Sequence, residues 1–446
     1  SPDRKPRRDL PNRCPLDLDP AASMSPHQPE GQAWDEYGRL RAELAEACAK
    51  RPLAIYVHVP FCQIRCGYCD FNTYTVGFGP GADRESYDQS ALTEMRMGAG
   101  ILSDAGMPKR PASSIFFGGG TPTLLSTDIL ERLLAGVGEN FGIARGAEIT
   151  VEANPESVDE AALERLAKAG FTRVSFGMQS AVPEVLRVLD RRHDPAKLPG
   201  LVGAARRLGM DVSVDLIYGA PGESLTDWQT SLEEAIAMEP DHISAYALVI
   251  EEGTKMGAQV ARGQLPMPDP DDEASKYEIA DRLLGEAGYS WYEISNFARR
   301  EAGEEGIVST QLRHASKHNL AYWRDWDWWG IGPGAHSHIG RYRWWNVKHP
   351  SAYAQRLREG LSPAHAGEIL DAPTREMERI LLAVRTSEGV EAPQEGEGDR
   401  EAFYAALEPL ASKGLIDAQA ADEGRAILTL QGRLLADYVT RELLGY

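Results

Sequence analysis

YVHVPFCQIRCGYCDFNTY, residues 56–74, is the stretch that decides the fold class of this chain. It opens with an apolar, β-branched run typical of a buried strand and passes directly into Cys62, Cys66 and Cys69. Three thiolates on one tight loop can ligate three irons of a cubane and leave the fourth iron open. The chain has only five cysteines, and three of them lie within residues 62–69. This clustering indicates metal or cluster binding in a reducing cytosol, not a secreted disulfide framework.

A zinc ion is the main alternative to a cluster as the group that these cysteines bind. A structural zinc ion normally has four protein ligands, so His58 or Asp70 would have to complete the site. Three free thiols are the simplest alternative of all. The spacing alone leaves these options open, and the sequence downstream favours the cluster.

A second motif, SIFFGGGTPTLL at residues 114–125, runs from a strand into Gly118, Gly119, Gly120, Thr121 and Pro122. Glycines let a backbone approach a ligand closely, and exposed amides there can bind a carboxylate or receive an amine. Alone, such a run could be a tight strand-to-helix turn. Its place one strand after the cysteine loop indicates a ligand site.

From residue 53 onward, strand-like runs alternate with helical patterns. The expected strands lie at 54–59, 114–117, 147–153, 173–178, 212–219 and 242–249. The expected helices between them include 127–141, 159–170 and 227–239. Alternation of this kind predicts an α/β fold with a parallel sheet and right-handed crossovers, here a partial (β/α)6 TIM-like barrel.

Four segments follow from this pattern. We expect residues 1–50 to form a disordered extension and a short helix at 34–50, with the residues before Met24 an extension without a role. Residues 51–250 form the barrel, 251–365 an aromatic-rich connecting region, and 366–446 a module of helices and a hairpin that resembles a winged helix.

The composition excludes some partners. The net charge is -20 and the chain shows no strong basic stripe, so a nucleic-acid partner is not expected. No apolar run approaches the roughly 20 residues that span a bilayer, which leaves only contact with a membrane surface open. Together with the cysteine usage, these features predict a cytoplasmic protein.

With these motifs in place, the chain resembles the HemN/HemW group of radical S-adenosylmethionine (SAM) proteins over roughly residues 53 to 445. The resemblance implies a [4Fe–4S] cluster on Cys62, Cys66 and Cys69, with SAM on the open iron. It implies SAM contacts from positions that mostly end apolar strands, where barrel enzymes build their sites. These are Tyr56, Gly119, Gly120, Thr121, Glu152, Gln179, Arg191 and Asp215.

The resemblance also implies a reaction. An electron from a low-potential donor such as flavodoxin or ferredoxin would cleave SAM reductively to methionine and a 5′-deoxyadenosyl radical. The protein would orient SAM and exclude water and oxygen, because the hard chemistry belongs to the cofactor.

Two functions of different class exist in this group. One is oxygen-independent coproporphyrinogen III dehydrogenation, by radical decarboxylation of propionates; the other is a heme chaperone that binds heme and passes it to an acceptor hemoprotein. The dehydrogenases carry a fourth cysteine two residues after the third, where this chain has Phe71. Their substrate-holding N-terminal arm also has no counterpart here. Both absences put decarboxylation in doubt and favour the chaperone.

HNLAYW, at residues 318–323, matches the segment associated with heme binding in the chaperones. The resemblance implies heme contacts from His318, Asn319, Tyr322 and Trp323. An imidazole is a standard axial ligand, and six of the nine tryptophans, which offer large rigid faces for a macrocycle, lie within residues 323–345.

Other interpretations of this region stay open. His318 and Asn319 could cap a helix while the tryptophans pack the barrel bottom. Tyr322 is an alternative axial or propionate-contacting group, and His314, His336 and His338 are further candidates for the axial ligand.

Overall fold

The cysteine loop leaves the carboxyl end of β2 (Leu53–Val59), a strand in which every residue is buried. The structure, a computed structural model, describes residues 30–43, 48, 50–396 and 398–446. The expected disorder of the N-terminal tail and the status of Met24 therefore lie outside the described residues. Burial on both faces is typical of a parallel strand covered by helices on one side and by the barrel interior on the other.

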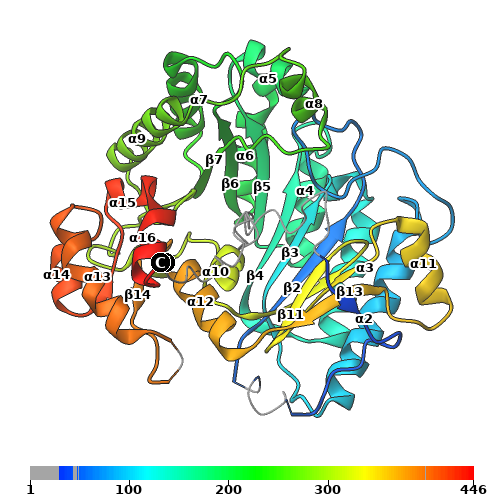
Figure 1. The fold of residues 1–446 in the computed structure, drawn as a ribbon. Coiled ribbons are helices and arrows are strands. Elements are labelled where there is room, and N and C mark those ends of the chain that lie inside the picture. The colour runs from blue at the N-terminus through cyan, green and yellow to red at the C-terminus, as the bar shows by residue number, and fades with distance from the viewer. Residues whose placement is uncertain (1–29, 44–47, 49, 397) are drawn as a thin grey trace.

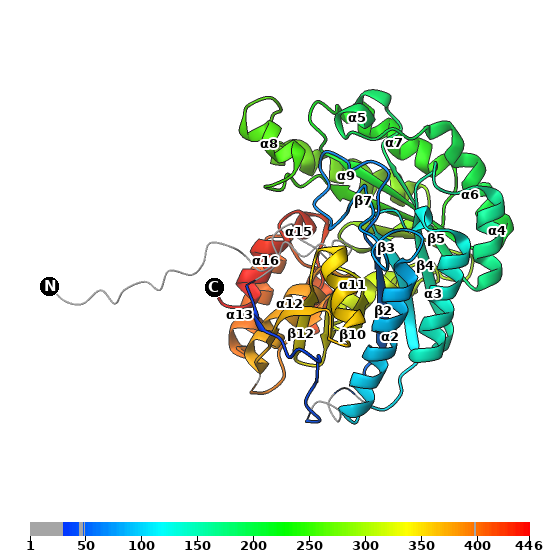
Figure 2. The same cartoon turned by 90° about the vertical axis from the view of Figure 1, so that its right-hand side faces the viewer.

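Six parallel strands form the barrel in chain order. They are β2, β3 (Ala112–Gly119), β4 (Ile143–Ala153), β5 (Arg173–Gln179), β6 (Asp211–Tyr218) and β7 (His242–Ala247). The crossover helices are α2 (Tyr87–Asp104), α3 (Thr127–Asn140), α4 (Glu160–Ala169), α5 (Pro183–Val188), α6 (Leu198–Arg207) and α7 (Leu225–Ala237). Figure 2 shows α2, α3, α4 and α6 along the outer side of these strands. The predicted α/β class and partial (β/α)6 barrel are confirmed.

Local signals explain the helix boundaries. Ser126 caps α3 by accepting a hydrogen bond from the Ile129 amide, and Asp159 caps α4 in the same way. Gly170 ends α4 in the left-handed conformation at φ 112°, which glycine adopts without steric cost. These caps fix where each crossover begins and ends.

The segment after residue 250 extends the barrel sheet at both edges. Antiparallel β8 (Tyr289–Glu293) and β9 (Asn296–Arg299) follow β7, and β10 (Asp327–Ile331) runs parallel beside β2. Beyond β10 lie β11 (His336–Ile339), β12 (Tyr342–Asn346), β13 (Ala364–Ile369) and the short β1 (Gln32–Ala33). The sheet is continuous across the expected boundary at 250/251, and the one at 365/366 falls inside β13.

The helices of this segment surround the added strands. They are α8 (Lys255–Ala261), α9 (Pro270–Glu286), α10 (Lys317–Trp323) and α11 (Pro350–Arg358). The HNLAYW segment forms α10, which contacts β3 and reaches Ser114 near the beginning of that strand through His318. It therefore lies at the opposite end of the barrel from the cysteine loop.

The C-terminal module has a core of its own, built from residues such as Leu407, Leu410 and Val439. Its helices are α12 (Ala372–Ala383), α13 (Arg400–Ser412), α14 (Ala418–Asp422), α15 (Leu430–Leu434) and α16 (Ala436–Leu443). Figure 1 shows this module beside α10. The expected hairpin is reduced to one bridge between Ile416 and Leu428, while β15 (Arg425–Ala426) pairs with β14 (Val390–Glu391).

The helix expected at 34–50 is wrong for its first part. Residues 34–43 form turns and irregular backbone, and residues 44–47 and 49 lie outside the described part. Gln32 and Ala33 pair with β13 instead, and Trp34 stacks on Trp344 at a ring distance of 5.7 Å. Packing against the sheet outweighs the helical propensity of this segment. Within the described residues, no helix is long and apolar enough to cross a membrane.

Candidate functional site

The cysteine loop opens onto a small cavity at the carboxyl end of the barrel. The cavity has a volume of about 120 Å³, and Cys62, Cys66 and Cys69 all line it. Most of the residues that the sequence predicted for SAM line the same cavity. They are Gly119, Gly120, Thr121, Glu152, Gln179, Arg191 and Asp215. The fold thus brings these residues from four strands and two loops to one place.

The three thiols do not converge on one point as the ligands of a single metal ion do. Thiolates bind zinc at about 2.3 Å, which puts the ligands of a tetrahedral site about 4 Å apart. The three Sγ atoms do not all lie within 4.8 Å of one another, and among the described residues none of them joins two other His, Cys, Asp or Glu ligands at that spacing. His58, considered as a fourth ligand, has Nδ1 at 3.0 Å from the Tyr56 hydroxyl and Nε2 at 2.9 Å from the Asn72 carbonyl. The donor set therefore fits a cluster, in which each thiolate binds its own iron.

Burial affects the chemistry of these thiols. It raises the pKa of Cys69 to about 12, with further increases from the nearby Cys62 and Cys66. Burial likewise raises the pKa of Cys62. Because metal ligation requires the thiolate, assembly of a cluster here has to displace protons.

Each cysteine also has an arginine close to it. Arg84 donates a hydrogen bond to the Cys62 carbonyl at 3.1 Å, and Arg65 donates one to the Cys69 carbonyl at 3.3 Å. Arg191 donates to the Sγ atom of Cys66 at 3.7 Å. Sequence reasoning found only Arg191, since nothing in the motif marks the other two. The three guanidinium groups can stabilise a negatively charged cluster.

The glycine motif clamps the root of the cysteine loop. The Gly120 amide donates to the Val59 carbonyl at 2.8 Å, and the Thr121 amide donates to the Phe61 carbonyl at 2.7 Å. A Cβ atom on Gly120 would lie 2.3 Å from the Phe61 oxygen, so only glycine allows this approach. These amides are therefore used within the protein, unlike the ligand-facing amides expected from the sequence.

Two carboxylates face the cavity. Glu152 accepts a hydrogen bond from the Gly119 amide at 3.1 Å, and Asp215 accepts one from the Ser175 hydroxyl at 2.8 Å. Burial raises the pKa of Asp215. Both side chains can accept hydrogen bonds from the hydroxyl or amino groups of a ligand.

Gln179 and Arg191 occupy the same wall. Gln179 ends β5 with a φ of 64°, a conformation that costs energy outside glycine and is common at ligand sites. Arg191 donates to the Asn154 side chain at 2.9 Å and to the Gly177 carbonyl at 2.7 Å. Its buried Nε atom has no partner within the described residues, and a bound anion would satisfy it.

Tyr56 is the one predicted SAM residue that does not line this cavity. Its ring is buried next to Phe116 and lies 6.4 Å from the ring of His318. Its hydroxyl reaches His58. Tyr56 therefore connects β2 to α10.

The predicted heme segment is mostly packed inside the protein. His318 is 2% exposed, its Nδ1 lies 2.9 Å from the Ser114 hydroxyl, and its Nε2 lies 3.0 Å from the Tyr322 hydroxyl. Burial lowers the pKa of His318 to about 3 and raises that of Tyr322 above its usual range. Trp323 is 6% exposed. His318 would have to break two hydrogen bonds to reach a heme iron.

The aromatic-rich segment packs largely upon itself. Trp329 contacts Trp344 edge to face at 5.0 Å, and Trp328 lies 4.7 Å from His338. Burial lowers the pKa of His336 to about 3 and that of His338 to about 4. These contacts agree with the interpretation in which the tryptophans pack the protein interior.

A larger cavity of about 420 Å³ fills the barrel below the cysteines, within the size range of small-molecule sites. It shares Cys69, Phe71, Glu152 and Asp215 with the smaller cavity. Asn319 of the predicted heme segment lines its floor. Arg173, Ser213 and His242 also line it, and sequence reasoning missed them. Polar residues at every second position of apolar strands were the signal that could have found them.

Comparisons with known proteins agree with this geometry. The family model "Radical SAM superfamily" matches residues 56–235. The chain is 42% identical over 396 residues to a protein named heme chaperone HemW from Mycobacterium tuberculosis, covering 89% of this chain and 95% of the relative. It is 33% identical to HemW from Bacillus subtilis, covering 87% and 98%.

A solved structure shares the fold. Coproporphyrinogen III oxidase (HemN) from Escherichia coli, a radical SAM enzyme, superposes with a TM-score of 0.75 at 24% identity, covering 95% of this chain and 97% of that one. At this identity the likeness shows the fold alone. The family match and the extensive identity to the relatives show that the chain belongs to the HemW family of radical SAM proteins.

Proposed function

We propose that this chain is a heme chaperone: it binds heme and transfers it to an acceptor hemoprotein, and it carries a [4Fe–4S] cluster with SAM on the open iron. The observation that carries the proposal is Phe71. Its apolar ring stands where the porphyrinogen dehydrogenases have a fourth cysteine, and it lines both cavities. The names of the relatives, which cover most of the chain, support the same function.

The residues that would hold the cluster and SAM lie at the carboxyl end of the barrel strands. Cys62, Cys66 and Cys69 would each ligate one iron. The SAM contacts would come from Glu152, Gln179, Arg191, Asp215 and the segment 119–121. Tyr56 would support this site indirectly from its position on β2. When bound, these groups supply reductive cleavage of SAM, for which flavodoxin or ferredoxin would provide the electron. Three thiols kept reduced suit a protein that works in the cytoplasm.

Heme would enter the larger cavity and reach the segment from His318 to Trp323. Asn319 lines that cavity and can donate or accept a hydrogen bond. His318 and Tyr322 brace α10 through their mutual hydrogen bond, and Trp323 is buried behind them. Acceptor proteins would take heme from the open, cysteine-side end of the cavity.

One pair of assays tests the proposal. The chain is reconstituted anaerobically with iron and sulfide, supplied with SAM and a reductant, and given heme in one sample and coproporphyrinogen III in another. We expect stoichiometric heme absorption, transfer of that absorption to a heme-free acceptor such as apo-myoglobin, and no decarboxylated porphyrinogen. Decarboxylated product would support the dehydrogenase instead, and absence of heme binding would refute the chaperone.

A further inference from the structure

The interior of the barrel is polar where such barrels usually pack bulky branched residues. Inward-facing side chains alternate along four neighbouring strands, as expected from the two-residue period of a strand. Every member of this set lines the cavity of about 420 Å³: Thr150 and Glu152 on β4, Arg173 and Ser175 on β5, Ser213 and Asp215 on β6, and His242 and Ser244 on β7. A hydrophobic core would not favour these polar side chains, so a bound polar ligand is the simplest explanation for them.

The set has an upper and a lower row. The upper row, with Glu152 and Asp215, belongs to the cysteine-side cavity. The lower row is formed by Thr150, Arg173 and His242, which are 1%, 2% and 2% exposed. We call this lower row the barrel floor, because α10 closes the barrel directly beneath it.

The barrel floor has polar atoms without partners. Within the described residues, Arg173 Nε, His242 Nδ1 and Thr150 Oγ1 are buried and make no hydrogen bond. Buried polar groups of folded proteins are nearly always paired, by protein, water or ligand. Three unpaired atoms lining one cavity therefore indicate a group that binds there.

The hydrogen bonds around Tyr292 determine which proton His242 offers. The Tyr292 hydroxyl accepts from the Ser316 amide and from the Asn319 side chain, each at 3.3 Å. Its own proton is then left to donate to Nε2 of His242, at 2.7 Å. Burial, and then neighbouring positive charges, lower the pKa of His242 well below its usual value. A neutral imidazole that accepts at Nε2 carries its proton on Nδ1, so the unpaired atom is a donor.

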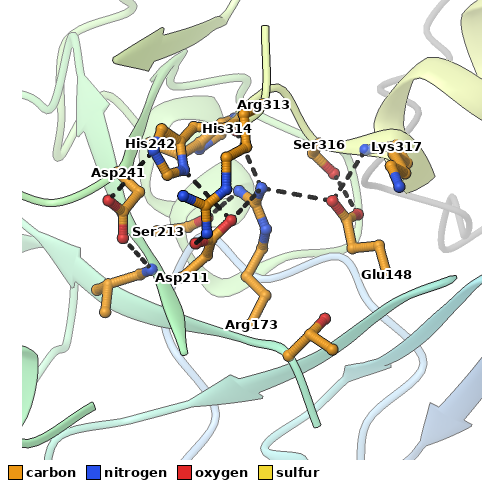
Figure 3. A network of polar contacts seen from close by, with 12 residues as sticks. Glu148, Arg173, Asp211, Ser213, Asp241, His242, Arg313, His314, Ser316 and Lys317 are labelled. Atoms are coloured by element: carbon orange, nitrogen blue, oxygen red, sulfur yellow. Dashed lines mark hydrogen bonds and ion pairs between the residues drawn. The ribbon is translucent and has the colours of Figure 1, made fainter. Parts of the chain in front are cut away.

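Arg173 is held so that one donor stays available. Its Nη1 donates to Ser213 at 3.1 Å and its Nη2 to the His314 carbonyl at 3.0 Å. The same Nη2 lies 3.4 Å from Glu148 and 3.6 Å from Asp211. Figure 3 shows the guanidinium between these groups, with His242 two strands away on β7. Its Nε is the guanidinium nitrogen that makes no hydrogen bond within the described residues.

We propose that the barrel floor binds a carboxylate, with one oxygen on Arg173 Nε–H, the other on His242 Nδ1–H and the Thr150 hydroxyl beside them. Charge-assisted hydrogen bonds of this kind are the strong ones. A singly charged group suits the floor better than a phosphate does, because Glu148 and Asp211 already pair with Arg173. The organic part of the ligand would then extend upward past Glu152 and Asp215 toward the cysteines.

The carboxylate could be a heme propionate, which rests on the proposed function, or belong to a free short-chain acid. Two probe pairs distinguish these sources in the anaerobically reconstituted chain: heme against heme dimethyl ester by absorbance titration, and sodium propionate by calorimetry. If a heme propionate binds, the wild type prefers heme over the ester by about tenfold or more. If a free acid binds, propionate binds measurably while heme and ester bind equally.

Conservative variants assign the effect to the floor. Arg173→Lys keeps a positive charge near Glu148 but removes Nε, and Thr150→Val removes the hydroxyl without changing the shape. We expect both to reduce the preference for heme over the ester, or the affinity for propionate, while Arg300→Lys in the loop after β9 leaves them unchanged. Melting temperatures confirm folding of each variant.

The outcomes separate the two proposals. Equal affinity for heme and ester together with no propionate binding would overturn the carboxylate site, even where heme binds. Propionate binding that is lost in Arg173→Lys, in a chain that binds neither heme nor ester, would support the site and refute the chaperone.

Discussion

The guanidinium of Arg191 lies on the sulfur of Cys66, with Nη1 3.7 Å from Sγ. Two further hydrogen bonds, to Asn154 and to the Gly177 carbonyl, hold this side chain between the cysteine loop and the end of β5. A fixed cation beside a ligand sulfur stabilises a negatively charged cluster. The pair therefore links the cysteine motif to the barrel strands that line the rest of the cavity.

Replacing Cys66 tests the cluster assignment. We expect Cys66→Ala to lose most of the iron and the brown absorbance after anaerobic reconstitution, because two thiolates hold a cubane far less well than three. Iron and sulfide content per chain is the measurement.

Cys48 provides the matched control. It is fully buried, and its carbonyl accepts from Arg110, which also donates to the Arg51 carbonyl just before the amino end of β2, the end of that strand away from the cysteine loop. Cys48→Ala should keep wild-type iron content while losing some stability. Equal iron loss in both variants would show that Cys66 acts through folding and would contradict its assignment as a ligand.

Arg84 should raise the reduction potential of the cluster. Its guanidinium donates a hydrogen bond to the Cys62 carbonyl. Removing a partly exposed charge at this range changes the free energy of cluster reduction by on the order of 1 kcal/mol, which is roughly 40 mV for one electron. We expect Arg84→Gln to lower the midpoint potential by tens of millivolts in a redox titration followed by electron paramagnetic resonance. Arg282→Gln, on the exposed side of α9, should leave the potential unchanged; an unchanged potential in Arg84→Gln would exclude this role.

Much of the fold and the site followed from local patterns. Strand and helix periods predict the barrel, and polar residues such as Glu152 and Gln179 stand where apolar strands end, so the parallel sheet of the partial barrel brings them together at one end. Arg191 lies outside the strands and was predicted from the family resemblance instead. The structure therefore confirms the barrel that these local patterns predict.

Long-range pairing was not predictable in this way. No local signal shows that β10 pairs with β2, which lies more than 250 residues earlier in the chain. This pairing places tryptophans in the sheet, where they pack against neighbouring side chains. The contact between Tyr56 and His318 of α10 likewise joins residues far apart in the sequence. Arg65 and Arg84 reach backbone carbonyls of the cysteine loop, contacts that a sequence motif does not encode.

His318 should prove to be a supporting residue of α10. Its ring stacks on Phe116 at 5.0 Å and bonds Ser114 and Tyr322. We expect His318→Ala to lower the free energy of unfolding by about 2–4 kcal/mol, through the cavity and the unpaired hydroxyls it leaves. Urea denaturation gives this value. His318→Gln, which can keep one hydrogen bond, should retain the heme absorbance; its loss in a folded Gln variant would instead identify His318 as the axial ligand.

His314 should make stability depend on pH. Burial lowers its pKa, but Asp211, Asp241 and Glu301 together outweigh burial, so the pKa is raised above its usual value. A raised pKa in the folded state stabilises the protein fully below the unfolded pKa of about 6.5 and loses that effect as pH rises through the folded pKa.

The measurement compares wild type with His314→Gln. We expect the stability advantage of the wild type to be largest near pH 6 and to shrink toward pH 9. Buried neutral histidines such as His58 are present in both proteins and cancel in this difference. An advantage that grew with pH would contradict the raised pKa.

Gly120 should be irreplaceable at the root of the cysteine loop. A Cβ atom there would lie 2.3 Å from the Phe61 oxygen, a backbone atom that cannot move alone. We expect Gly120→Ala to lower the free energy of unfolding by about 1–3 kcal/mol, as overpacking does, and to reduce cluster assembly by shifting the backbone next to Cys62. Gly200→Ala on α6 is the control, because no atom lies within 4 Å of the added methyl and alanine there should stabilise the helix by up to about 1 kcal/mol. Thermal melts and iron content measure both effects, and a Gly120→Ala protein with wild-type iron content would show that the clamp is not needed to shape the cysteine loop.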